Sequence, residues 1–334
     1  MAAAALRRLG HRIASKKCFV GVFLTPQRTA AQDAARTQFS MACMSGLPES
    51  ERDGILGFTE VRGQHIHYQK VGYGNHTVLL LPGALGCSRT DFSVQLDTMN
   101  RDLFTMIAWD PVGCGNSITR DRDWSGHFLE RDAHDVANLM RNLEHPKFSL
   151  MGWSDGGMTA MILAACYPEQ VRKLVVWGSN AFVTPDDVQT YENLRDINTW
   201  SERMRKTFLD EYDEPYFRKQ WSLFVDTLHP PPTENTPYYF FYFRKQWSMF
   251  VDALHHYLTD HDGNICKEYL EKITCPTLII HGEKDPLKPV SHAEYLKDNI
   301  KNSRFIMIPD GKHNLHKKHY RQFNSLVENF LLEP

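Results

Sequence analysis

The stretch SLMGWSDGGM, residues 149–158, decides the fold that the rest of the chain must adopt. Its apolar first half predicts a buried strand, and the small and apolar residues that follow, up to Ala165, predict a helix. Between the two lies a Gly-x-Ser-x-Gly pattern made by Gly152, Ser154 and Gly156. Such a serine sits on a strained strand-to-helix turn, where only small flanking residues fit. The backbone N–H after the serine then faces any oxyanion formed there. The stretch therefore predicts a nucleophile elbow with Ser154 as the nucleophile.

The composition is that of an ordinary globular protein. The 334 residues are 42% hydrophobic and 23% charged, with a net charge of −2, which gives no reason to expect nucleic acid as a partner. Seven cysteines are scattered from Cys18 to Cys275 without a C-x-x-C pair. This pattern favours a reduced compartment over a disulfide framework or a zinc site. We expect no metal, no cofactor and no membrane span.

The first 45 residues differ from the rest of the chain. Up to Gln32 they contain no acidic residue, while Arg and Lys are spread among small and apolar residues. This composition predicts a mitochondrial transit peptide, and hence a mitochondrial location. The alternatives are a secretory signal peptide and an unstructured tail without a targeting function. In each case residues 1–45 lie outside the fold.

Strands and helices alternate over most of the remaining sequence. After an antiparallel hairpin around Arg62-Gly63, short apolar runs alternate with helical patterns, which is typical of a parallel sheet with right-handed crossovers. We expect core segments at 52–180 and 274–334. The expected strands after the hairpin are 77–81, 103–109, 148–151, 173–177, 277–281 and 304–308. Such sheets place their chemistry at the carboxyl ends of the strands.

Residues 181–273 interrupt the alternation. They are rich in aromatic and charged residues and contain no buried-strand run, so they predict a helical cap inserted between two strands. They also contain an internal duplication, because residues 216–229 recur as 242–255 with changes only at Met249 and Ala253. Two copies are too few for a solenoid. We expect one copy to pack as the cap helix and the other to be loosely held.

A serine nucleophile needs an acid and a base, in the order Ser, acid, His in this type of sheet. The strand ending near residue 177 is followed by Ser179 and Asn180, neither of which ionises. The strand ending near residue 281 is followed by Glu283 and Asp285. Asp285, before a proline in a tight turn, is the predicted acid, and Glu283 is the alternative.

The predicted base is His313. It follows the last strand, and Gly311 gives its loop the freedom to reach over the sheet. A solvated surface histidine is the competing interpretation. His316 and His319 follow at three and six residues, but no partner set with fixed metal-ligand spacing accompanies them.

An oxyanion hole needs a second N–H besides that of Asp155. The loop PGALG, residues 82–86, follows the first central strand, and the N–H of Ala84 is the predicted second donor. A simple strand-ending turn is the competing interpretation. One such donor typically contributes about 3 kcal/mol to the stability of the transition state.

Together these motifs resemble those of the α/β-hydrolase superfamily. Elbow, acid, base and oxyanion loop occur in the family order over residues 57–334. The motifs GWSDGG at 152–157 and HGEKDPL at 281–287 are most similar to mitochondrial serine hydrolases that cleave α-amino acid esters. The resemblance implies an α/β-hydrolase fold and gives the triad roles to Ser154, Asp285 and His313. The duplicated segment departs from the family, whose cap has room for one copy.

Asp155 adds a prediction about the substrate. Its N–H belongs to the oxyanion hole while its side chain starts beside the reacting carbonyl, so a carboxylate there can pair with an ammonium on the next carbon. The competing interpretation is a carboxylate that stabilises the helix dipole, worth about 0.3–1 kcal/mol. The expected function is hydrolysis of small-molecule esters, notably α-amino acid esters, by a monomer with an acyl-enzyme intermediate.

Other functions fit the sequence less well. A dinucleotide loop at Gly113 lacks the third glycine, and a dehalogenase or epoxide hydrolase would carry Asp in place of Ser154. A carbon–carbon bond hydrolase of dienoates keeps the same triad and is the main alternative. A binding protein on the same fold is the other, although such proteins usually lose part of the triad.

Overall fold

The structure, a computed structural model, describes residues 54–118, 120–228 and 263–334. The expected transit peptide at 1–45 and the second copy of the repeat at 242–255 lie outside these residues, so both stay predictions. In the described part of the chain no helix is long and apolar enough to cross a membrane. Five cysteines lie within this part, and all are free.

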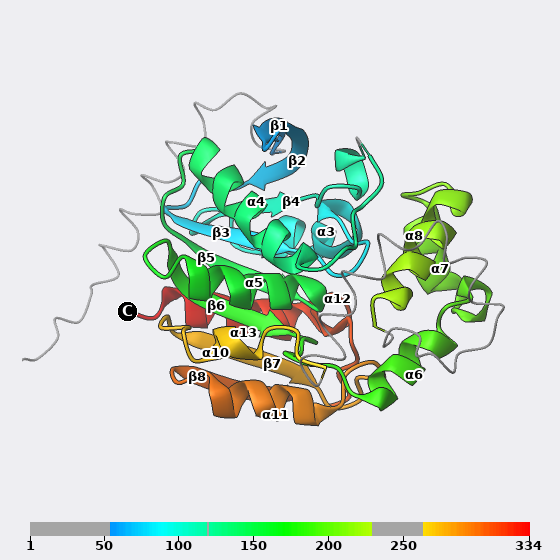
Figure 1. The fold of residues 1–334 in the computed structure, drawn as a ribbon. Helices are drawn as coiled ribbons and strands as arrows, with labels where there is room; N and C mark the ends of the chain where they lie inside the picture. The colour runs from blue at the N-terminus through cyan, green and yellow to red at the C-terminus, as the bar shows by residue number, and fades with distance from the viewer. Residues whose placement is uncertain (1–53, 119, 229–262) are drawn as a thin grey trace, which may run out of the picture. The chain divides into compact units, whose positions relative to one another are not determined.

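One eight-stranded sheet forms the centre of the molecule (Figure 1). Its order is β1-β2-β4-β3-β5-β6-β7-β8, antiparallel at β1, β2 and β4 and parallel from β4 through β8. The strand bounds are β1 Ile55–Val61, β2 Gln64–Val71, β3 His76–Leu81, β4 Phe104–Trp109, β5 Phe148–Trp153, β6 Val171–Trp177, β7 Thr277–Gly282 and β8 Ser303–Ile308. This order confirms the predicted α/β fold class.

The antiparallel edge depends on its turn. Arg62 and Gly63 join β1 to β2 with φ of 50° and 72°. Two consecutive residues of positive φ are typical of a two-residue hairpin turn whose twist matches that of the strands. The hairpin predicted around these residues is confirmed.

Helices cover both faces of the sheet and divide the core in two. On one face, α4, α5, α10 and α11 bury Val136, Met161 and Leu296 against the strands. On the other, α3 and α13 bury Phe92 and Phe323. Their bounds are α3 Ser88–Thr98, α4 Phe128–Asn142, α5 Asp155–Cys166, α10 Lys267–Leu270, α11 Val290–Asn299, α12 Leu315–Lys318 and α13 Tyr320–Leu332, with the short 3₁₀ helix η1 at Gly115–Ser117.

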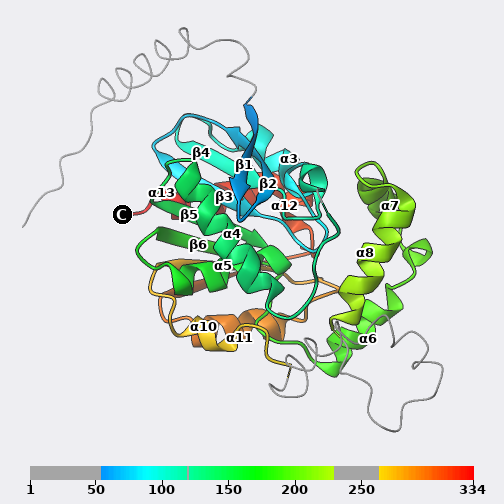
Figure 2. The same cartoon turned by 45° about the horizontal axis from the view of Figure 1, so that its top comes forward.

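The described stretch 181–228 of the expected cap is mainly helical. It contains α6 Pro185–Asn193, η2 Ile197–Thr199, α7 Glu202–Leu209 and α8 Glu214–Asp226, which stand together beyond one end of the sheet (Figures 1 and 2). An aromatic cluster joins it to the loops after β3 and β4, because Trp221 and Phe224 of α8 share that cluster with Leu85 and Cys114. The first copy of the repeat therefore forms α8 and packs its apolar face over the carboxyl ends of the strands.

Candidate active site

Ser154 occupies a strained turn between β5 and α5. Its φ is 54° and its ψ −120°, and the residue is only 6% exposed. A Cβ on Gly152 would lie 2.4 Å from the Gly156 carbonyl oxygen, and one on Gly156 would lie 2.1 Å from that of Leu81. Both positions therefore exclude any side chain, which is the steric reason for the glycines of the motif.

Asp285 and His313, from the loops after β7 and β8, form a hydrogen-bonded pair. The Nδ1–H of His313 donates to Asp285 Oδ2 at 2.9 Å, while Asp285 Oδ1 accepts the N–H groups of Leu287 at 2.9 Å and Lys288 at 3.1 Å. Burial opposes ionisation, but His313, the Leu287 N–H and the charge of His281 outweigh it and hold the pKa of Asp285 below its usual value. The alternative acid, Glu283, is exposed and instead accepts the Asp310 N–H.

His313 lies against the elbow. The Trp153 indole N–H donates to the His313 carbonyl at 3.0 Å, and the two rings are 5.3 Å apart. A Cβ on Gly178, at the end of β6, would lie 3.1 Å from His313 Cε1. Among the described residues no hydrogen bond joins Ser154 to His313, and such bonds often tighten only when substrate binds.

The predicted oxyanion donors lie together at the elbow. The loop around Ala84 is held by a turn bond from Gly86 N–H to Gly83 O at 2.9 Å, and Leu85 has a φ of 55°. Ala84 and Asp155 line one small cavity between this loop and the start of α5. Neither backbone N–H forms a hydrogen bond within the described part of the chain, so both remain available to a ligand.

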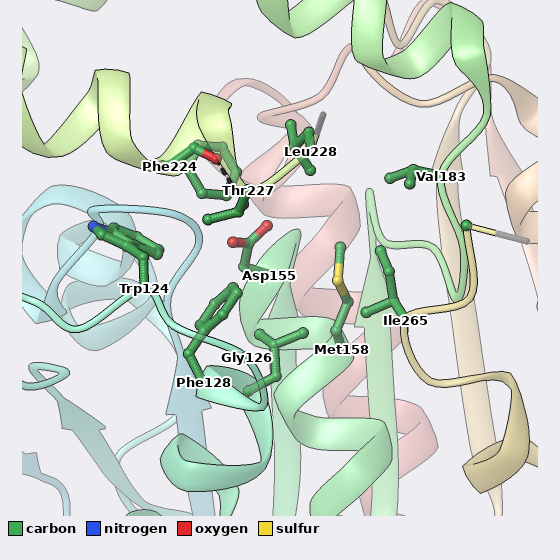
Figure 3. A pocket seen from close by; sticks show the side chains of 12 residues that line it. Trp124, Gly126, Phe128, Asp155, Met158, Val183, Phe224, Thr227, Leu228 and Ile265 are labelled. Atoms are coloured by element: carbon green, nitrogen blue, oxygen red, sulfur yellow. Dashed lines mark hydrogen bonds between the residues drawn. The ribbon is translucent and has the colours of Figure 1, made fainter. Parts of the chain in front are cut away.

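The Asp155 side chain enters an apolar pocket under the cap (Figure 3). No ion pair with any described residue reaches its carboxylate, and the residue is 7% exposed. Burial raises the pKa of Asp155 to about 6, against the opposing attraction of Lys288, Arg122 and His313. The other side chains of the pocket are those of Trp124, Phe128, Leu129, Met158, Val183, Phe224, Thr227, Leu228 and Ile265.

Two buried cations near Asp155 were not found from the sequence. Arg122 pairs with Asp132 at 2.5 Å and stacks on Trp124, with its guanidinium carbon 4.6 Å from the ring centre. Lys288 is 2% exposed and forms no ion pair with a described residue. Lys288 follows the predicted acid by three residues in a charged loop, and a lysine in such a loop is normally a solvated surface group. The sequence pattern therefore did not indicate that its side chain is buried.

His316 is a buried histidine whose ring packs against that of Trp153, 4.8 Å away. Its Nδ1 accepts the Trp177 indole N–H at 2.9 Å, and its Nε2–H donates to the Asp91 carbonyl at 3.1 Å. Complete burial holds its pKa well below the usual value, so the ring stays neutral. Within the described residues no group of three His, Cys, Asp or Glu side chains is arranged to hold a metal ion.

Comparison with known proteins shows which protein family the chain belongs to. Residues 76–320 match the model of the alpha/beta hydrolase fold family, and the chain belongs to that family. It is 45% identical over 271 residues to human "Serine hydrolase BPHL", covering 81% of this chain and 84% of the relative. The mouse protein of the same name matches equally. The chain is thus a serine hydrolase of the α/β-hydrolase fold.

More distant relatives share the fold. A 2-hydroxy-6-oxo-6-(2'-aminophenyl)hexa-2,4-dienoic acid hydrolase of Metapseudomonas resinovorans is 24% identical, over 85% of this chain and 93% of its own. A solved meta-cleavage product hydrolase, CumD, superposes with a TM-score of 0.62 at 21% identity, covering 84% of this chain and 99% of that one.

Proposed function

We propose that the protein hydrolyses carboxylic esters of α-amino acids through an acyl-enzyme on Ser154. The observation that carries the proposal is the Asp155 carboxylate, which is buried in an otherwise apolar pocket next to the nucleophile and has no ion-pair partner among the described residues. A buried carboxylate without a partner cation favours a ligand that brings one.

The proposed chemistry uses the groups at the elbow in turn. Ser154 Oγ attacks the ester carbonyl carbon while His313 Nε2 takes its proton, and Asp285 stabilises the resulting imidazolium. The carbonyl oxygen becomes an oxyanion that accepts the N–H groups of Ala84 and Asp155. Collapse breaks the bond to the alcohol, which receives the proton from His313. Water then attacks the acyl-enzyme with the same residues, releasing the acid and restoring Ser154.

The position of Asp155 relates amino-acid recognition to this chemistry. Because its N–H and its side chain belong to the same residue, an oxyanion bound to the N–H has the carboxylate close by. The nitrogen of an ammonium on the α-carbon is two bonds from the reacting carbonyl carbon, so it falls within reach of that carboxylate. Burial strengthens the pairing, since water screens it less than at a surface.

The nucleophile is tested by an activity probe. We expect a fluorophosphonate to label the wild-type protein and to leave Ser154→Ala unlabelled. Ser179→Ala is the matched control, because this buried serine follows the neighbouring strand β6 and its hydroxyl has no hydrogen-bond partner in the described structure. Labelling retained in Ser154→Ala would disprove the assignment, and an unlabelled wild-type protein would favour a non-catalytic binding protein.

The substrate is tested by a pair of esters that differ only in the ammonium. Valyl ethyl ester carries it, and isovaleryl ethyl ester lacks it. We expect Asp155→Ala to raise KM for the valyl ester at least tenfold and to change the isovaleryl ester less than threefold. An equal rise in KM for both esters would show that Asp155 does not bind the ammonium.

The alternative reaction is cleavage of a carbon–carbon bond in a dienoate, the reaction type named for the Metapseudomonas relative. It uses the same serine, acid and base. We expect the valyl ester to be hydrolysed and a 2-hydroxy-6-oxodienoate to be left intact. The opposite result would replace the ester proposal with this one.

A mitochondrial location is also proposed, on the basic, acid-free composition of residues 1–45. Fusing these residues to a fluorescent protein is expected to carry it into mitochondria. Diffuse fluorescence, or secretion of the fusion, would reject the proposal.

A further inference from the structure

Lys288 is a buried lysine tied to the proposed acid. It lies in the loop between β7 and α11, where its backbone N–H donates to Asp285 Oδ1 at 3.1 Å. The loop is otherwise solvated, since Glu283, Lys284 and Pro286 are exposed, yet Lys288 is only 2% exposed. Its side chain therefore points inward from the same turn that positions the acid of the triad.

The Lys288 ammonium meets the cap. It lies 5.0 Å from the centre of the Tyr191 ring on α6, and Tyr191, itself 3% exposed, also offers it the hydroxyl. Tyr191 is in ring contact with Phe224, 5.8 Å away, and Phe224 lines the pocket that holds Asp155. Tyr191 and Phe224 thus connect Lys288 to the wall of the proposed acyl pocket.

No carboxylate of the described residues forms an ion pair with Lys288. Asp155 and Asp187 are the carboxylates whose charges act on it. Asp187 already has partners, because its Oδ2 accepts from His292 Nε2 at 2.9 Å and from the N–H and hydroxyl of Thr184 at 2.7 and 2.8 Å. Asp155 is the remaining one, and it too lacks an ion pair.

Lys288 and Asp155 are therefore two buried, opposite charges that act on each other without forming an ion pair in the described structure. Removing a lone ammonium or carboxylate from water costs several kcal/mol, and direct pairing is the usual compensation. An apolar side chain at position 288 would fill the same space without that cost. Buried charges that stay unpaired gather at binding and catalytic sites, where a ligand completes them.

We propose that Lys288 binds a carboxylate carried by the acyl group of the substrate, so that the site selects acyl groups with both an ammonium and a carboxylate. The α-esters of acidic amino acids are the simplest members of this class. The ammonium pairs with Asp155, and the side-chain carboxylate reaches Lys288 and the Tyr191 hydroxyl. This inference rests on the proposed ester hydrolysis and narrows its substrate class.

The test compares glutamyl with glutaminyl ethyl ester, which match in size and differ in the side-chain charge. We expect wild-type kcat/KM to favour the glutamyl ester at least tenfold. In Lys288→Met, which keeps the length and removes the charge, the ratio should fall at least tenfold, and Lys288→Arg should retain part of it. Lys284→Met is the control, because Lys284 lies in the same loop but is exposed and pairs with Asp310.

Two outcomes would overturn the inference: a glutamyl-to-glutaminyl ratio near one in the wild-type protein, or a ratio unchanged in Lys288→Met. If Lys288→Met also hydrolysed the valyl ester faster than the wild-type protein at that unchanged ratio, Lys288 would merely compete with substrate for Asp155. Should Lys288→Met fail to fold, Lys288→Gln gives the same comparison. The valyl ester separates the two proposals: if the wild-type protein hydrolyses no amino-acid ester, the proposed function fails, whereas hydrolysis without charge preference rejects only the role of Lys288.

Discussion

At the scale of single residues, two neighbours at the elbow are energetically unfavourable: Ser154 has a strained backbone and Asp155 has a buried charge. Ser154 has a positive φ of 54°, which typically costs about 1–3 kcal/mol for a residue with a side chain. Asp155 next to it holds a carboxylate that is 7% exposed and has no ion pair with a described residue. Local strain and buried charge of this kind persist where the surrounding structure supports them and the site uses them. The adjoining glycines supply that support, because loop and helix backbone pack directly on them.

Asp155→Asn should stabilise the fold at neutral pH. The pKa of Asp155 is about 6 in the folded protein against 3.8 when exposed, so the folded state binds the proton more tightly. Ionisation of Asp155 therefore lowers stability as pH rises from about 4 to 6, and the loss persists above. One pKa unit corresponds to about 1.4 kcal/mol, which gives an upper limit of about 3 kcal/mol at pH 7.

Urea unfolding at several pH values checks this prediction. The gain of Asp155→Asn over the wild-type protein should approach zero below pH 4 and reach its maximum above pH 6. Asp102→Asn, in an exposed turn before β4, is the control for removing one carboxylate from the surface. A gain of the same size at all pH values would mean that charge is not its origin.

At the scale of elements, the predicted strands were found because each is a short apolar run buried on both faces. Residues 78–81 of β3 and 106–109 of β4 are all at most 1% exposed. Helix α3, with the sequence SRTDFSVQLDT, was not predicted, since its polar residues favour caps and turns as much as helix. Its first turn is instead fixed by tertiary contacts, with Ser88 N–H donating to Asp110 Oδ1 at 2.8 Å.

The difference between local sequence patterns and tertiary contacts also decides which site residues could be predicted. Ser154, Asp285, His313 and Ala84 could be predicted because local motifs and their order along the chain place them at one sheet edge. The inward turn of Lys288 depends on Tyr191, nearly a hundred positions earlier in the cap, so no local pattern records it. Contacts between core and cap could therefore not be predicted from the sequence.

One such contact joins the cap to the proposed oxyanion loop. Tyr212, 4% exposed between α7 and α8, donates its hydroxyl to the Leu85 carbonyl at 2.8 Å and accepts the Gly115 N–H at 2.9 Å. Leu85 follows Ala84 directly. Tyr212→Phe leaves both backbone groups without partners, which costs about 1–3 kcal/mol of stability. With the loop less firmly held, kcat for the valyl ester should fall about tenfold and KM much less.

Tyr216→Phe is the matched control. Its hydroxyl, also in the cap, donates to the Gly113 carbonyl at 2.7 Å and does not reach the oxyanion loop. We expect a lower melting temperature with kcat within twofold of the wild-type value. Equal losses of kcat in both variants would show that cap stability, and not the loop at Ala84, controls the rate.

At the scale of the whole molecule, the described residues already contain what the proposed reaction needs. The sheet brings the ends of β3, β5, β7 and β8 to one edge, and α8 closes the pocket above it through Phe224 and Thr227. The first copy of the repeat supplies this helix. We therefore expect the second copy, residues 242–255, to be dispensable for the proposed reaction.

Deleting residues 217–242 tests this expectation. The deletion joins Tyr216 to Phe243, so the sequence of α8 is restored from the second copy with two changes, Leu223 to Met and Thr227 to Ala. All five buried side chains of α8 are retained in type, namely Phe217, Gln220, Trp221, Phe224 and Val225. A Leu-to-Met exchange typically costs less than about 1.5 kcal/mol. We expect the shortened protein to keep its melting temperature within a few degrees and its kcat/KM for the valyl ester within threefold. Loss of either would mean that both copies are needed and that the cap has a second layer absent from the family.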